Sequence, residues 1–352
     1  MDTSRATFRR FAVTLLTLTT LAASSATTHA DQDCFTIRGR QLSAHAGPAA
    51  VSGSMTAIVQ HGSWDTRPMV RIVLFGPFGA VEVGSWSPTR FIEDIALDVA
   101  TAFVSADHGI FALDLRVPSQ PQFLDFIDLV DAQHIVLDHQ KIYIATTGVG
   151  GTGWFDIIDV ADPTDLRQMG QLAWTGGDPE KNAIDAAGET VVIADDGGLL
   201  ILDVGDPYNP VEAGRWDGEA VHDAALVGSY AVVTSEPADP PINPKVTVLD
   251  LSNPASPAPV GQWLAPSTVL SLAEYGGDVL AGTESDGLYL VDLDDPAHPT
   301  VLDHWDELGL EVTALSTAWP TITASSSDFG LTILGLTPEC LPPRMFSGRL
   351  DP

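Results

Sequence analysis

The chain has 352 residues, of which 45% are hydrophobic, and a formal net charge of −31 at pH 7. This apolar fraction is enough for a packed core, so intrinsic disorder does not explain the charge. Nucleic acids and anionic lipids are bound mainly through Lys and Arg, of which the chain has only 16, and we expect no nucleic-acid partner. The partner is left open as a protein or a small ligand, and the acidic charge favours a cationic one.

Residues 1–30 are typical of a signal peptide. Three Arg precede the apolar run FAVTLLTLTTLAA, and the small-residue pattern THA stands directly before Asp31. The run is too short to span a bilayer, so we expect no transmembrane segment. Arg9 and Arg10 leave both twin-arginine and Sec export open. Removal of this segment, with its three Arg and one Asp, leaves 322 residues with a charge of −33. We expect export to the periplasm, the cell surface or the medium.

A repeat follows the predicted signal peptide. Its anchor is an Asp that closes an apolar run, and degenerate copies place Val73 and Gly335 at the first and last anchor positions. The intervals between anchors are 41, 45, 44, 47, 42 and 43 residues. Six copies have a Pro four residues after the anchor, and four have a Gly eleven residues after it. The anchor aspartates are Asp114, Asp159, Asp203, Asp250 and Asp292.

Each unit predicts four short strands. Runs such as GLLILD (198–203) have strand length, a Pro-rich turn precedes an edge strand, and Asp-Gly pairs favour hairpins. No useful length of chain shows helical periodicity. Four strands in about 44 residues is the period of a propeller blade. We therefore predict an all-β, seven-bladed β-propeller over residues 31–345, followed by a tail at 346–352.

The last copy lacks an outer strand, and the N-terminal segment CFTIRGRQL (34–42) can supply it. Gly39 then takes the position of the repeat glycine, so the N-terminal strand completes the last blade and closes the ring. Cys34 and Cys340 become neighbours across this closure in repeat coordinates. In an exported chain with two cysteines this placement predicts a disulfide.

The segments LLILDVGDPYNP, VTVLDLSNPASP and LYLVDLDDPAHP resemble the LVIVD repeat, which is named for its apolar strand ending in Asp. The resemblance implies an exported or cell-surface β-propeller of mostly unassigned function, and it brings no catalytic motif. We interpret the anchor Asp as an acceptor for backbone N–H groups of the following turn. The Trp or Ile two residues after the Gly is expected to pack between blades. A calcium ladder built from the anchors is the alternative.

The third strand of each unit should be innermost and line an axial channel. Polar residues recur near its start on six copies: Glu93, Asp94, Gln133, His134, Asn182, His222, Asp223, Ser271, Glu311 and Thr313. A wet channel mouth with no further role explains such residues. The sharper hypothesis is a zinc or other divalent metal site formed by Asp94, His134, His222 and Asp223. When no metal is bound, the surrounding negative field should keep nearby histidines protonated to higher pH.

No Walker loop, nucleophile elbow, HExxH helix or CxxC pair occurs in the chain. Our first functional hypothesis is a non-enzymatic exported binding or protein-interaction propeller, expected to be a monomer. The alternatives are a divalent-metal-dependent hydrolase or lyase acting at the channel mouth, and an envelope or surface scaffold without a small ligand. No cofactor is certain.

Overall fold

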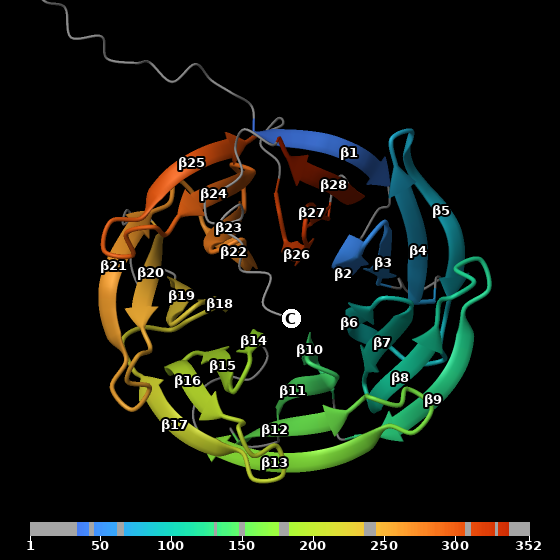
Figure 1. Cartoon of the computed structure of the whole chain (residues 1–352), viewed down its shortest axis with the longest axis horizontal. Coiled ribbons are helices and arrows are strands. Elements are labelled where there is room, and N and C mark those ends of the chain that lie inside the picture. The colour runs from blue at the N-terminus through green and yellow to red at the C-terminus, as the bar shows by residue number, and fades with distance from the viewer. Residues whose placement is uncertain are drawn as a thin grey trace, which may run out of the picture. The chain divides into compact units, whose positions relative to one another are not determined.

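A computed structural model of the protein describes residues 34–41, 46–61, 67–129, 132–147, 152–175, 183–235, 244–306, 311–327 and 330–337. These ranges form 28 strands in seven four-stranded antiparallel sheets. The sheets stand around a common axis as the blades of a propeller (Figure 1), which confirms the predicted fold. The described ranges contain strands and turns only, and none of their segments is a helix able to cross a membrane. The predicted domain boundaries after residues 30 and 345 lie outside the described residues.

Each blade is numbered in chain order, and its strands are given from the axis outwards. Blade 1 contains β2 (Ala46–Ser52), β3 (Met55–Gln60), β4 (Met69–Gly76) and β5 (Gly79–Trp86); blade 2 contains β6 (Ile92–Asp98), β7 (Thr101–Ala106), β8 (Gly109–Asp114) and β9 (Gln122–Asp128); blade 3 contains β10 (His134–Asp138), β11 (Lys141–Thr147), β12 (Thr152–Asp159) and β13 (Arg167–Thr175). Blade 4 contains β14 (Ile184–Ala187), β15 (Thr190–Asp195), β16 (Gly198–Asp203) and β17 (Val211–Trp216); blade 5 contains β18 (Asp223–Val227), β19 (Tyr230–Ser235), β20 (Lys245–Asp250) and β21 (Ala258–Leu264). Blade 6 contains β22 (Val269–Tyr275), β23 (Asp278–Thr283), β24 (Leu288–Asp292) and β25 (Thr300–Trp305); blade 7 contains β26 (Ala314–Ala318), β27 (Thr321–Ser326), β28 (Gly330–Leu336) and β1 (Phe35–Gln41).

The N-terminal strand closes the ring as predicted. β1 pairs antiparallel with β28, and its Gly39 lies opposite Ile333, two residues before Gly335. Gly214 lies opposite Ile201 in the same way, two residues before the anchor Asp203. A β-bulge adjoins the glycine in both pairs, so β1 adopts the register of the other outer strands.

The hydrophobic core is divided into seven clusters, one at each interface between neighbouring blades. Trp86 of blade 1 packs edge-on against Phe111 of blade 2 with ring centroids 5.1 Å apart, and Trp263 of blade 5 reaches Tyr289 of blade 6 at the same distance. These contacts confirm, for Trp86 and Trp263, that the residue two positions after the repeat glycine packs between blades. The cluster between blades 7 and 1 is the smallest, with Ala46, Ile58, Val73, Leu331 and Ile333 as its buried residues.

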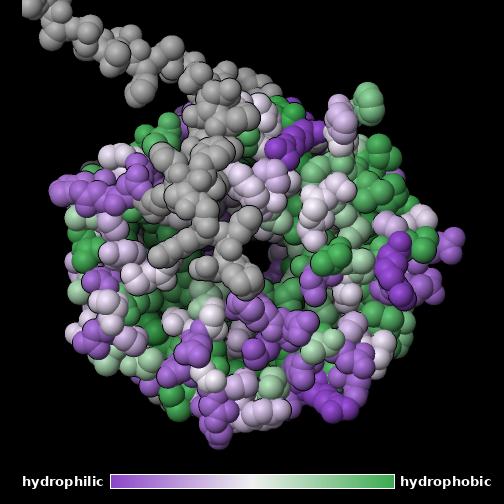
Figure 2. Space-filling view, viewed as in Figure 1, coloured by the Kyte–Doolittle hydropathy of each residue, from purple (hydrophilic) through white to green (hydrophobic). Residues whose placement is uncertain are grey.

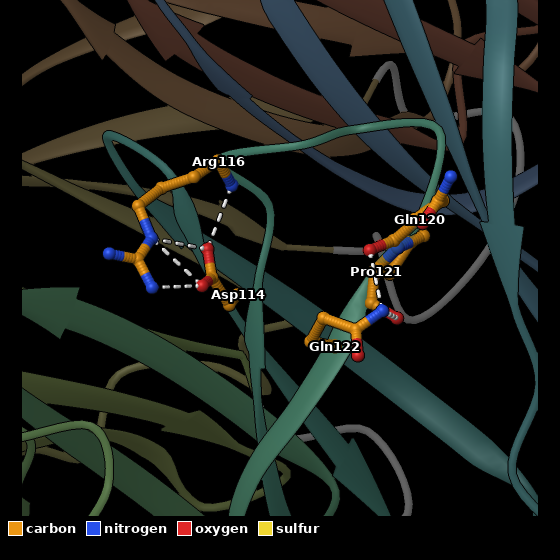
Figure 3. Close-up of polar contacts among 5 residues, drawn as sticks. All are labelled: Asp114, Arg116, Gln120, Pro121 and Gln122. Carbon is orange, nitrogen blue, oxygen red and sulfur yellow. Dashed lines mark hydrogen bonds and ion pairs between the residues drawn. The ribbon is translucent and has the colours of Figure 1, made fainter.

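The five anchor aspartates each accept a backbone hydrogen bond in the turn that follows. Asp114 Oδ1 accepts the N–H of Arg116 at 2.8 Å, and the Arg116 guanidinium also pairs with its carboxylate (Figure 3). The same bond, from the N–H two residues further on, is made at Asp159, Asp203, Asp250 and Asp292 over 2.7 to 3.0 Å. The anchors are therefore Asx-turn acceptors, as the repeat predicts.

The repeat glycine and the repeat proline meet across each blade interface where both are present. A methyl group at Gly214 would overlap the carbonyl oxygen of Pro254 in the next blade. Gly170 stands in the same relation to Pro207. Gly84 with Pro118 and Gly261 with Pro296 repeat the contact. The outer strand of one blade thus touches the turn of the next, at a separation that only glycine permits.

Two blades replace this glycine with aspartate, and both carboxylates bond to the following blade. Asp125 Oδ2 accepts the N–H of Leu166 in blade 3 at 2.7 Å. Asp303 Oδ2 accepts the N–H groups of Cys34 and Phe35 at 2.9 and 3.2 Å. Because Cys34 and Phe35 lead into β1, the Asp303 contact holds the closing strand.

The first copy of the repeat departs from the predicted alignment by one residue. Gly84 lies opposite Ile72, so Leu74, rather than Val73, occupies the position that Asp203 has in blade 4. β4 and β5 are joined by a two-residue hairpin turn instead of the Pro-rich turn, and the shorter connection shifts the alignment. At the last copy the anchor is Gly335, and a methyl group there would overlap the Arg38 side chain.

Candidate functional site

The innermost strands of all seven blades enclose an axial cavity of about 860 Å³. Its lining comes from β2, β6, β10, β14, β18, β22 and β26, and Figure 2 shows the opening at the centre of the ring. The third strand of each repeat is therefore innermost, as predicted. Within the described lining there is no Lys or Arg side chain.

The four side chains predicted to form a site all line this cavity: Asp94, His134, His222 and Asp223. The strand register places three of them at the same level along the propeller axis: Asp94, His134 and Asp223. Each of these residues directly precedes a residue that holds the same register position in its inner strand. Ile95 pairs with Val104, Ile135 with Ile144 and Ala224 with Val233. Asn182, which the sequence also suggested for this ring, lies outside the described residues.

Asp94 and Asp223 link neighbouring blades. Asp94 accepts the N–H of Ile95 at 2.7 Å through Oδ1 and the N–H of Ile135, on the next inner strand, at 3.0 Å through Oδ2. Asp223 makes the equivalent pair of bonds to Ala224 at 2.8 Å and Leu272 at 2.6 Å. Each carboxylate thus caps a backbone donor at the free edge of the following blade.

Two further aspartates make the same inter-blade bond and were not predicted. Asp185 accepts the N–H of Leu226 in blade 5 at 2.7 Å, and Asp138 accepts the N–H of Gly188 in blade 4 at 3.0 Å. We call Asp94, Asp138, Asp185 and Asp223 the inner carboxylate bridges. Together they connect blades 2, 3, 4, 5 and 6 in series. A polar residue inside an otherwise apolar inner strand was the available sequence signal, as in IDAA (184–187).

Burial shifts the titration of three bridging carboxyls. Loss of hydration raises the pKa of Asp94 and of Asp223 to about 7, and that of Asp185 to about 6, although the backbone N–H bonds oppose the shift. Neighbouring carboxylates add to it: Glu93 acts on Asp94, Asp185 on Asp223, and Glu274 with Asp138 on Asp185. The cavity wall therefore holds like charges that repel one another near neutral pH.

The structure corrects the expected titration of His134, and among the described residues it does not bring the expected metal ligands together. Burial lowers the pKa of His134, and the opposing field of Glu93 is the smaller effect, so the predicted upward shift is wrong for this histidine. The described residues also contain no group of three or more His, Cys, Asp or Glu that could hold a metal ion. The proposed metal ligands stand on blades 2, 3 and 5, and both aspartates are turned to backbone donors instead.

The predicted disulfide falls partly outside the described residues, because Cys340 is not among them. Cys34 is 8% exposed, and its carbonyl oxygen accepts the N–H of Thr337 at 2.8 Å. Thr337 stands three residues before Cys340 in the sequence. Thr337 therefore adjoins Cys34, and the bond itself stays a prediction.

Comparison with known families identifies the repeat. The LVIVD repeat model matches residues 183–218 and 221–264, which run from the inner strand of blade 4 to the outer strand of blade 5. These two segments are LVIVD repeats, and the predicted resemblance is confirmed there. By sequence, no curated protein matches the chain.

Solved structures share the architecture at low sequence identity. The WD40 repeats of RRP9 superpose with a TM-score of 0.64 at 12% identity, covering 86% of this chain and 98% of that one. A chain of the mitotic checkpoint complex gives a TM-score of 0.62 at 12% identity, covering 92% and 98%. BamB from Moraxella catarrhalis gives 0.52 at 10% identity, covering 82% and 83%. At these identities the likeness shows the fold alone.

Proposed function

We propose that this chain is an exported, non-enzymatic binding protein whose ligand or partner engages the axial cavity. The observation that carries the proposal is the cavity itself, which receives lining from every blade and holds polar groups from several of them. Its carboxylates bond to backbone donors of neighbouring blades, an arrangement that fixes the wall rather than poising acid and base for a reaction. No arrangement of the described residues favours the hydrolase or lyase alternative.

Filling the cavity tests this proposal. Ala187 is exposed and lines the cavity, so Ala187→Trp places a large side chain inside it. Ala161 is exposed on an outer turn, and Ala161→Trp is the matched control. The wild type and both variants are purified from the exported fraction and compared by native mass spectrometry. We expect a bound species on the wild type and on Ala161→Trp that is lost from Ala187→Trp. Equal occupancy in all three, or none in the wild type, would contradict the proposal.

Export has its own test. Full-length chain expressed in a Gram-negative host should appear in the periplasm or medium with Asp31 as its first residue, measured by N-terminal sequencing. Substituting both Arg9 and Arg10 with Lys separates the two routes, because twin-arginine export depends on the pair and Sec export tolerates the change. A cytoplasmic product that retains residues 1–30 would overturn the export part of the proposal.

A further inference from the structure

The inner strand edges of blades 3, 5 and 6 present acceptors to the cavity. In an antiparallel strand the N–H and C=O of one residue point to the same side. The N–H groups of Ile135, Leu226 and Leu272 are capped by carboxylates of the preceding blades, so these residues direct their carbonyl oxygens to the same free edge. The backbone N–H donors at these three positions are already hydrogen-bonded to carboxylates. The groups left to accept hydrogen bonds from a ligand are the backbone carbonyl oxygens and the carboxylate oxygens.

One wall of the cavity concentrates negative charge. It consists of β14, β18 and β22, which carry Asp185, Asp223 and Glu274 on three adjacent blades. Asp185 interacts electrostatically with both Asp223 and Glu274, so their charges act on one another across the wall. The described lining has no Lys or Arg to offset this repulsion, and a cationic ligand would relieve it.

We propose that the wall formed by β14, β18 and β22 binds an organic cation that carries an ammonium or guanidinium group. This inference rests on the proposed binding function and specifies its ligand. The described carboxylates are not grouped to hold a metal ion. A guanidinium spreads five donors over a planar fork and can reach oxygens that a single ion cannot. A volume of about 860 Å³ leaves room for the remainder of a small organic molecule.

Binding should be coupled to proton release. Burial raises the pKa of Asp223 to about 7 and that of Asp185 to about 6, so both carboxyls carry protons below neutral pH. Four carboxyl groups act on one another at this wall, and His222 lies beside one of them in the sequence: Asp138, Asp185, Asp223 and Glu274. Elsewhere around the cavity, Asp94 interacts electrostatically with Glu93 and His61, and His134 interacts with Glu93. A bound cation favours the ionised carboxyls, so affinity should rise from pH 5 to pH 8.

The experiment is calorimetric titration of the purified exported protein with butylguanidinium and with butylammonium. Butylurea, which is neutral and of similar shape, is the ligand control. Glu274→Gln removes one wall charge and keeps the oxygen that accepts the N–H of Gly277. Asp128→Asn removes one charge from an exposed position on the outer strand β9 and is the protein control. Titrations at pH 5, 6.5 and 8, in two buffers of different ionisation enthalpy, count the protons released.

We expect saturable binding of at least one cation, no binding of butylurea, and roughly fivefold weaker binding by Glu274→Gln, as for loss of one charge near 4 Å that is solvated by bulk water. Asp128→Asn should bind as the wild type does. Equal binding of butylurea, equal affinity of Glu274→Gln and wild type, or affinity independent of pH would overturn the inference. If no cation binds while Ala187→Trp still loses the species held by the wild type, the ligand class is wrong and the proposed function stands.

Discussion

Gly214 of blade 4 lies against the carbonyl oxygen of Pro254 in blade 5, so closely that a methyl group on Gly214 would overlap that oxygen. The repeat glycine and the repeat proline are therefore the two sides of one contact between successive blades. The Pro begins a turn whose carbonyl faces the preceding outer strand, and the Gly gives that strand room to approach. This contact recurs at four blade interfaces and places the outer strand of one blade against the turn of the next.

Gly214→Ala should destabilise the protein by about 1–3 kcal/mol, because one of two backbone segments must move to admit the methyl group. Gly76→Ala is the matched control, since a methyl group there meets nothing within 4 Å. The control should stay within about 0.5 kcal/mol of the wild type. Urea unfolding of the three proteins measures the difference. Equal midpoints for Gly214→Ala and Gly76→Ala would contradict the contact.

Asp303→Ala should weaken closure of the ring. It removes the acceptor for the N–H groups of Cys34 and Phe35, and leaving a buried donor unsatisfied costs about 1–3 kcal/mol. Asp303→Asn retains a carbonyl oxygen that can accept these bonds, so it should lose much less stability than Asp303→Ala. Hydrogen exchange of the amides in β1 (Phe35–Gln41) reports the local effect, which we expect in Asp303→Ala and not in Asp125→Ala. Unchanged protection of β1 in Asp303→Ala would show that Asp303 does not hold this strand.

Cys34 and Cys340 should form a disulfide when the protein is in an oxidising compartment. Peptide mapping without reduction should recover the two cysteines in one linked fragment, and finding both thiols free would refute the pairing. Loss of the bond in Cys34→Ala should lower the melting temperature, because a link across about 300 residues contributes up to roughly 5 kcal/mol in the chain-entropy description. Seven blades should persist, since β1 also keeps its ladder with β28.

Three of the inner carboxylate bridges, Asp94, Asp185 and Asp223, should make the free energy of unfolding fall as pH rises from about 4 to 7. Burial raises the pKa of Asp94 to about 7 from an ordinary value of 3.8, so the folded state binds this proton more tightly than the unfolded chain. Its contribution is complete below the unfolded value and is lost as pH approaches 7. Carboxylates of the outer turns, such as Asp206 and Asp250, have pKa values below the ordinary 3.8. The stability that they contribute is present above pH 4 and is lost as the pH falls below it.

Asp94→Asn should therefore reduce the slope of the free energy of unfolding against pH, by no more than about 1.4 kcal/mol per pH unit. Urea unfolding at pH 4.5, 5.5, 6.5 and 7.5 gives the two slopes. The substitution also removes one backbone acceptor and lowers stability at every pH, so the slope is the quantity to compare. Parallel slopes for the two proteins would mean that Asp94 titrates in its ordinary range.

The repeat predicted the fold because its spacing is local and cumulative. Seven anchors at nearly constant intervals set the number of blades, and the offset of Gly39 was enough to assign β1 to blade 7 with the observed register. The first blade was misaligned by one residue, since nothing in the pattern shows that Pro77 lies in a two-residue hairpin rather than in the repeat turn.

The contacts between blades could not be predicted in the same way. Gly214 and Pro254 are forty residues apart, and each is explained locally by turn and strand chemistry. Asp94 and Asp223 were chosen correctly as cavity residues, but their bonds to Ile135 and Leu272 depend on how two blades are set against each other. Asp185 was missed for that reason: it is a polar residue in the otherwise apolar strand IDAA, but the strand alone does not identify Leu226 as its partner.

Asp125 and Asp303 make equivalent contacts to the outer strands of the blades that follow them, so the contact that closes the ring at blade 7 is also present at blade 3. Asp303 accepts the N–H groups of Cys34 and Phe35, where the closing strand β1 begins. Asp125 accepts the N–H of Leu166, the residue directly before β13, which is the outer strand of blade 3. A circular permutant that begins at Leu166 and ends in the preceding turn would close through β13 on a carboxylate placed as in the parent. The order of the blades along the chain is thus independent of the contact that closes the ring. A permuted gene that begins in blade 3 would need no newly designed closing contact.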